Sequence, residues 1–247
     1  MARPTLRVLC FGDSLTAGHH GCGAAYHPYA EKLAQMISMA LPHIDIDAVE
    51  DGKPGDMVRG GFCERLKQAF RKTATPYDWT IVLGGTNDLA YANVDPEDVY
   101  AELKRVWSLA LSKNTKVLAL TVPEVGVKGF RGHADERRNR LNDLIKSHKQ
   151  EDFHVFDLHA VLPYFALSAA DRARYWDDEV HLTAAGYDLM GAKIGINLVS
   201  ILVRDRVYPN PKQPRGFKDD KISFEEEEGD AAHLDQGYVV VRWKDLD

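Results

Sequence analysis

Short apolar runs alternate with longer segments of helical period along the first 204 residues of the chain. The short runs are rich in Val, Ile, Leu and aromatic residues, which predicts strands at residues 6–11, 44–49, 79–83, 117–122 and 153–156. The longer segments predict helices at residues 29–41, 64–71, 96–111, 136–149 and 183–203. In the first of these helices Leu33, Met36, Ile37 and Ala40 recur at i, i+3, i+4 and i+7, so they share one helix face.

Strands that alternate with helices form β-α-β units, whose right-handed crossovers place helices on both faces of a parallel sheet. We therefore predict an α/β fold, a three-layer α/β/α sandwich with a central, mostly parallel sheet of about five strands. Ligands of such sheets bind outside the carboxyl ends of the strands. The loops that follow the strands are consequently where chemistry is expected.

The composition excludes several classes of protein. The 247 residues include 31 Lys and Arg against 37 Asp and Glu, and this mildly acidic balance argues against nucleic-acid binding. The longest nearly apolar stretch, residues 194–203, is about half of the roughly 20 residues that a transmembrane helix needs, so we expect no membrane span. Residues 1–7 lack the features of a secretory signal, which predicts a cytoplasmic protein with reduced thiols at Cys10, Cys22 and Cys63.

The negative charge is concentrated near the end of the chain. Residues 205–247 hold seven basic and eleven acidic residues, and the proline-rich stretch 209–214 accompanies this change in composition. We predict a first domain at residues 1–204 and an acidic C-terminal extension at residues 205–247. The four glutamates at 225–228 are expected to be solvated, whereas the apolar segment 238–243 is expected to dock on the body or on a second chain. The oligomeric state is left open.

Candidate chemistry follows the first three predicted strands. Ser14, in the block Gly12-Asp13-Ser14-Leu15-Thr16, lies on a tight turn at the carboxyl edge of the sheet. Taken alone, such a serine more often caps a helix. The loops after the next two strands add Gly52 and Gly55, whose N–H groups can approach a ligand closely, and the side-chain amide of Asn87.

Late in the chain, Asp178 stands three residues before His181, just ahead of the last predicted helix. One short loop can present both groups, with the carboxylate accepting from one imidazole nitrogen while the other nitrogen faces a nucleophile. Ordinary α/β-hydrolases use the same types of residue. They carry Gly-x-Ser-x-Gly, however, and Thr16 occupies the position of its second glycine.

The four blocks, in this order from about residue 6 to about residue 203, resemble the GDSL family, also called the SGNH hydrolases. The resemblance implies a flavodoxin-like sandwich, in agreement with the periodicity, and makes residues 1–204 an SGNH-hydrolase catalytic domain. By similarity, Ser14 is the nucleophile of a catalytic triad with Asp178 and His181. An oxyanion hole is then formed by the N–H groups of Ser14 and Gly55 and by the side chain of Asn87.

Members of the family usually carry an Asn shortly before the glycine of the second block. Here the region reads Glu50-Asp51-Gly52-Lys53-Pro54-Gly55, so Gly52 stays open as the alternative oxyanion glycine. Adjacent histidines at His19 and His20 do not have the four-ligand spacing of a zinc site, and we expect neither a metal nor a cofactor.

The resemblance implies a lipase-like serine esterase that hydrolyses small or medium acyl esters, as small-molecule substrates, through an acyl-serine intermediate. Thioesters or lysophospholipids and O-acetylated carbohydrates stay open as substrates, because the pocket decides between them. A non-catalytic binding or scaffold protein on the same fold is the alternative from another class. If His181 is the general base, activity should rise as its imidazole loses a proton, near pH ~6.5.

Overall fold

The computed structural model describes residues 3–91, 93–127 and 133–205, so the predicted extension lies, apart from Asp205, outside the described residues. One five-stranded sheet has the order β4-β1-β5-β6-β7, and its four strand pairs are parallel. The strands are β1 (Thr5–Gly12), β4 (Asp45–Gly52), β5 (Trp79–Leu83), β6 (Lys116–Leu120) and β7 (Phe153–Phe156). This arrangement confirms the predicted α/β class and its parallel sheet.

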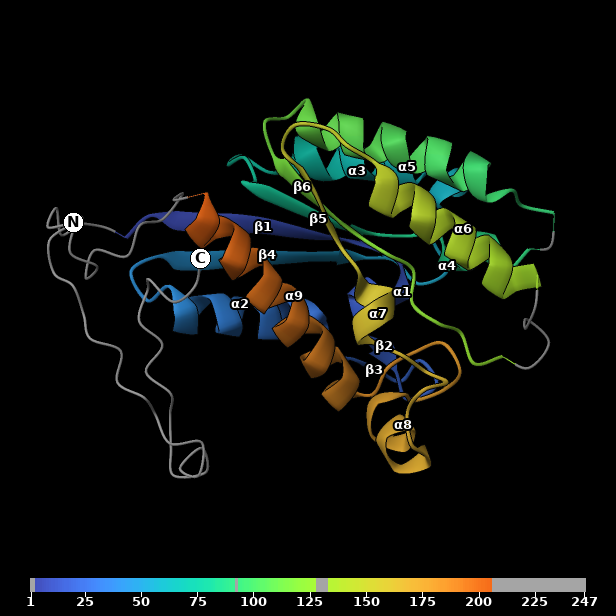
Figure 1. Ribbon diagram of the computed structural model, residues 1–247. Helices are drawn as coiled ribbons and strands as arrows, with labels where there is room; N and C mark the ends of the chain where they lie inside the picture. Colours follow the sequence, from blue (N-terminus) through green and yellow to red (C-terminus); the bar gives the residue numbers. More distant parts are fainter. Residues whose placement is uncertain (1–2, 92, 128–132, 206–247) are drawn as a thin grey trace, which may run out of the picture. The chain divides into compact units, whose positions relative to one another are not determined.

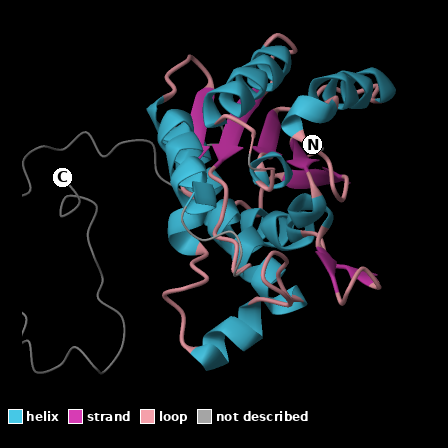
Figure 2. Ribbon diagram, turned by 90° about the vertical axis from the view of Figure 1, so that its right-hand side faces the viewer, coloured by secondary structure: helices cyan, strands magenta, loops and turns pink. Residues whose placement is uncertain are grey.

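Helices cover both faces of the sheet, as Figures 1 and 2 show. One face carries α3 (Phe62–Lys72), α5 (Pro96–Leu111) and α6 (His133–Ser147). The opposite face carries α2 (Tyr29–Ala40) and α9 (Ala184–Arg204). Successive residues of β1 point to opposite faces, so Val8 and Cys10 pack in the core with α2 and α9, whereas Leu9 and Phe11 pack with α3 and α5. The three-layer sandwich follows directly from this alternation.

The long helices begin where local signals place them. α5 has Pro96 in its first turn, and the side chain of Asp95 accepts a hydrogen bond from the Glu97 N–H at 2.9 Å. By length and composition α9 is the one described helix that could cross a membrane, but half of its apolar window is buried inside the protein. Its fully buried Met190, Ile194 and Leu198 belong to the core under α2, which is the packing of a core helix.

The chain changes direction across the sheet next to β1. It passes from β4 on one side of β1 to β5 on the other, so the loops after β1 and β5 diverge and leave a crevice at the carboxyl edge. Several short elements near this edge have no periodic signal and were not predicted. They are α1 (Ser14–Ala17), the hairpin of β2 (His19–His20) and β3 (Ala25–Tyr26), the 3-10 turn η1 (Val58–Gly60), α4 (Thr86–Leu89), α7 (Leu158–Val161) and α8 (Ala169–Tyr175).

Candidate active site

Ser14 begins the one-turn helix α1 directly after β1. Asp13 caps this helix, because its Oδ1 accepts a hydrogen bond from the Leu15 N–H at 3.0 Å. The turn therefore holds the Ser14 hydroxyl at the carboxyl edge of the sheet, and only 6% of the residue is exposed.

The loop before α9 brings a histidine and a carboxylate to this serine. His181 Nε2 lies 3.0 Å from Ser14 Oγ, and His181 Nδ1 lies 2.9 Å from Asp178 Oδ2. The other oxygen of Asp178 accepts from the backbone N–H groups of Val180 at 2.6 Å and of His181 at 2.5 Å. A single short loop thus presents both groups with their geometry locked, as the three-residue spacing predicts.

Asp178 is held in its ionised form. Partial burial raises its pKa, but hydrogen bonds from the His181 ring and from the N–H groups of His181 and Val180 outweigh burial and lower the pKa below its ordinary value. A carboxylate at this position keeps a proton on the Nδ1 of His181. The Nε2 of the neutral imidazole is then free to accept a proton from Ser14.

Within the described part of the chain, hydrogen-bond donors without partners occur on the loops that follow β1, β4 and β5. Asn87, on α4 after β5, donates one amide proton to the backbone oxygen of Asp56 at 2.8 Å, so this bond ties the loop of Gly55 to α4. The second amide proton has no partner among the described residues, and neither has the backbone N–H of Ser14 or of Gly55. Backbone and amide N–H groups without a partner are the kind of donor that an oxyanion hole requires.

The two candidate glycines differ in what surrounds them. The Gly52 N–H is already bound to Glu50 Oε1 at 2.5 Å, and a Cβ at Gly52 would lie 2.2 Å from the backbone nitrogen of Ala17. Gly55 has φ +76°, and a Cβ there would meet nothing within 4 Å. The geometry therefore favours Gly55, with its unbound N–H, as the donor.

Comparison with known proteins shows the family of the chain. A family model described as the GDSL-like lipase/acylhydrolase family matches residues 10–189, which is well over half of the chain. The chain belongs to this family. A curated relative, a multidomain esterase from Ruminococcus flavefaciens, is 24% identical over 167 residues, which are 64% of this chain and 21% of that protein. The chain thus spans about a fifth of the length of that relative.

Solved structures share the fold. A lipolytic protein of the G-D-S-L family from Veillonella parvula has 23% identity and a TM-score of 0.58, over 76% of this chain and 95% of that one. A carbohydrate acetylesterase family member from Sinorhizobium meliloti has 20% identity and a TM-score of 0.62, over 80% and 99%. Axe2, an acetylxylan esterase from Geobacillus stearothermophilus, has 19% identity and a TM-score of 0.60, over 81% and 96%.

Two residues that hold the loops of this GDSL-family site in place were not predicted from the sequence. Arg65 on α3 donates to Asp56 Oδ2 at 2.7 Å and to the backbone oxygen of Gly12 at 2.6 Å, which joins the ends of β1 and of the Gly55 loop. Asp88 is buried and accepts from the N–H groups of Val58 and Arg59 at 2.8 and 3.0 Å. Asp88 has a sequence signal, since it follows Asn87, whereas only tertiary contacts reveal Arg65.

The β2–β3 hairpin lies against the histidine of the site. The rings of His19 and His181 have their centroids 4.7 Å apart. The Tyr187 hydroxyl donates to the His19 backbone oxygen at 2.8 Å, and the Gly21 N–H donates to Asp177 Oδ2 at 2.7 Å. These bonds fasten the hairpin to the loop that carries His181, and they explain why a hairpin with two-residue strands persists here.

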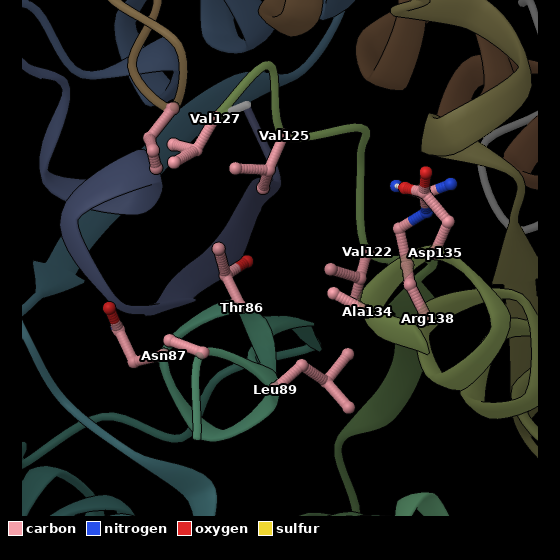
Figure 3. Close-up of a pocket in the computed structure, with 11 residues that line it drawn as sticks. Thr86, Asn87, Leu89, Val122, Val125, Val127, Ala134, Asp135 and Arg138 are labelled. Carbon is pink, nitrogen blue, oxygen red and sulfur yellow. Dashed lines mark hydrogen bonds and ion pairs between the residues drawn. The ribbon is translucent and has the colours of Figure 1, made fainter. Parts of the chain in front are cut away.

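Two hollows of different character flank the site. An apolar pocket with a volume of about 220 Å³ opens beside Asn87, between the loops after β5 and β6 and the start of α6 (Figure 3). Val180, next to His181, also lines it. The second hollow is a shallow depression of mixed character, in which Ala169, Ala173 and Trp176 lie beside polar and charged residues that include Tyr164, Arg172, Asp178 and Glu179.

Proposed function

We propose that this chain is a serine esterase that hydrolyses small or medium acyl esters through an acyl-serine intermediate. The observation that carries the proposal is the continuous hydrogen-bonded series from Asp178 through His181 to Ser14, next to the unused donors of Gly55 and Asn87. Membership in a family of lipases and acylhydrolases supports the same reaction class.

In the proposed first half-reaction, Ser14 Oγ attacks the ester carbonyl carbon while its proton passes to His181 Nε2. The negative charge moves to the carbonyl oxygen, which accepts from the N–H groups of Ser14 and Gly55 and from Asn87 Nδ2. Collapse of the tetrahedral intermediate breaks the bond to the alcohol oxygen, and His181 returns the proton to that oxygen. Asp178 stabilises the imidazolium that exists in between.

In the second half-reaction a water molecule attacks the acyl-serine and gives its proton to His181. The acid leaves when the bond to Ser14 Oγ breaks, and His181 returns the proton to the serine. Ser14 and His181 return to their starting protonation states, and water supplies the oxygen of the acid, so the proposed cycle balances without a metal or a cofactor.

A second candidate is an O-acetyl esterase that acts on carbohydrates. The observation that favours it is the polar depression beside Asp178, where Tyr164, Arg172 and Glu179 offer partners for sugar hydroxyls. Axe2, which shares the fold, is described as an acetylxylan esterase. Comparing acetylated xylooligosaccharides with simple acyl esters as substrates separates the two candidates. A cytoplasmic location and the division of the chain after residue 204 stay predictions.

Hydrolysis of p-nitrophenyl butanoate by wild type and by the Ser14→Ala variant tests the proposal. We expect the variant to lose activity to near background and to lose labelling by a fluorophosphonate probe. The control is Ser200→Ala, which removes an exposed serine hydroxyl that donates to the Ile196 backbone oxygen of its own helix. Unchanged hydrolysis in Ser14→Ala would contradict the proposal, and absence of labelling in wild type would favour a non-catalytic scaffold.

A further inference from the structure

The apolar pocket beside Asn87 ends on an ion pair between buried Arg138 and partly exposed Asp135. Arg138, on α6, donates from Nη1 to Asp135 Oδ1 at 2.6 Å and from Nη2 to Asn139 Oδ1 at 3.2 Å. Only 8% of the Arg138 side chain is exposed. Figure 3 shows this pair on the side of the pocket opposite Asn87, with Val122 between them. The pocket therefore runs from Asn87 to a guanidinium–carboxylate pair.

The rest of the pocket is suited to a hydrocarbon chain. Leu89, Val122, Val125 and Ala134 supply apolar walls between its two ends. A methylene group is similar in size to a water molecule, whose share of liquid volume is about 30 Å³, so a pocket of about 220 Å³ takes about seven non-hydrogen atoms. Hydrocarbon cannot replace the hydrogen-bond partners of the buried Arg138 guanidinium, and separating it from Asp135 leaves an uncompensated charge.

The position of the triad assigns this pocket to the acid part of an ester. The departing alcohol oxygen must take its proton from His181 Nε2, so the alcohol lies on the side of the imidazole and Asp178. That side carries the open polar depression, whereas the apolar pocket begins at Asn87, where the carbonyl group would be held. The acyl chain and the alcohol consequently enter different hollows, of which the one for the acyl chain is the more apolar.

We propose that the Arg138–Asp135 pair closes the acyl pocket and limits substrates to esters of acids with up to about eight carbons. The inference rests on the proposed esterase function and names the substrate class of that site. Each methylene buried in the pocket should raise kcat/KM about fourfold, until the chain reaches the ion pair. Beyond that length kcat/KM should stop rising and then fall.

The test is the profile of kcat/KM for p-nitrophenyl esters from acetyl to dodecanoyl, in wild type and in the double variant Asp135→Ala/Arg138→Leu. Both charges are removed together because a single substitution would leave the other charge unpaired. We expect the ratio of kcat/KM for decanoyl to hexanoyl ester to rise about tenfold or more in the double variant. Circular dichroism checks that the variant is folded.

A matched control removes an exposed ion pair that joins α6 to α5. Arg140 Nε lies 2.6 Å from Glu97 Oε1, and both side chains are about half exposed and outside the pocket. Glu97→Ala/Arg140→Leu should leave the chain-length profile as in wild type. Ala134→Leu, which fills part of the pocket, should move the cut-off to shorter chains and provides the test if the double variant does not fold.

The outcomes separate the inference from the function on which it rests. Loss of wild-type hydrolysis of acetyl and butanoyl esters on Ser14→Ala supports the esterase function independently of chain length. A wild-type maximum at dodecanoyl, or a profile that Ala134→Leu leaves unmoved, would overturn the inference while leaving the function intact. A change in selectivity of the variants along a series of alkyl acetates would also overturn the inference, because the pocket would then hold the alcohol.

Discussion

Replacing Asp13 by asparagine should make the free energy of unfolding less sensitive to pH between 5 and 8. The Asp13 side chain is fully buried next to Ser14, and its Oδ2 has no hydrogen-bond partner among the described residues. Burial raises the pKa of Asp13 from 3.8 to about 7. The Leu15 N–H and the nearby His181 lower this pKa, and the neighbouring Asp88 and Asp56 raise it.

The sign follows from the direction of this shift. A carboxyl group whose pKa is higher in the folded than in the unfolded state favours folding while it is protonated, so its contribution is complete below pH ~4 and is lost as the pH rises through about 7. With a pKa of 3.8 in the unfolded state and about 7 in the folded state, ionisation lowers the free energy of unfolding by about 4 kcal/mol at pH 8. About 2.5 kcal/mol of this loss falls between pH 5 and pH 8. Asparagine does not ionise, so Asp13→Asn lacks this loss.

Urea unfolding of wild type and Asp13→Asn at several pH values between 5 and 8 measures the difference. The control is Asp95→Asn at the start of α5, since Asp95 also caps a helix but is exposed. Hydrogen bonds to Glu97 lower the pKa of Asp95, so its stabilisation is lost only as the pH falls below about 4. Its curve should therefore parallel that of wild type from pH 5 to pH 8. Parallel curves for wild type and Asp13→Asn would refute the reasoning.

Two further predictions concern the oxyanion donors. Asn87→Ala should lower kcat for p-nitrophenyl hexanoate about 10²–10³-fold with a smaller change in KM, because the lost donor acts mainly in the transition state. A decrease in kcat of less than about tenfold would argue against Asn87 as a donor. Gly52→Ala should lower the free energy of unfolding by about 3 kcal/mol or more, because the new Cβ would lie 2.2 Å from the backbone nitrogen of Ala17. Gly55→Ala should lower it by only about 1 kcal/mol, the cost of a φ of +76° for alanine. Thermal unfolding compares the two variants, and equal losses would show that the loop after β4 is placed differently.

Local signals were enough to predict the helices and strands whose capping residues and hydrophobic period lie within or directly beside the element. The helix expected at residues 96–111 matches α5, because Asp95 and Pro96 define its start. The strand expected at residues 153–156 matches β7. The helix expected at residues 136–149 is found as α6 at His133–Ser147, and the strand expected to reach residue 122 ends at Leu120. Such ends have weak signals, since capping is shared with the adjoining loop.

Contacts between distant segments account for what the sequence did not predict. The β2–β3 hairpin has too few residues for a period, and Tyr187 and Asp177, more than 150 positions away, hold it in place. Arg65 has the appearance of an ordinary exposed helical residue in the sequence. In the fold its guanidinium donates to the backbone oxygen of Gly12 and to the carboxylate of Asp56. Its Cζ lies 3.9 Å from the centroid of the Phe11 ring.

The sequence by itself determined the α/β class and the order of the strands along the chain, and its resemblance to a family predicted the groups that perform acyl transfer. These depend on side-chain period and on residue type, both of which are local. Tertiary structure decided that Ser14 and His181, 167 positions apart, lie 3.0 Å from each other, that Gly55 rather than Gly52 has a free N–H, and that the apolar pocket ends at Arg138. The physical reason is that a parallel sheet brings the carboxyl ends of distant strands to one edge, where distances are set by packing of the layers and not by spacing along the chain.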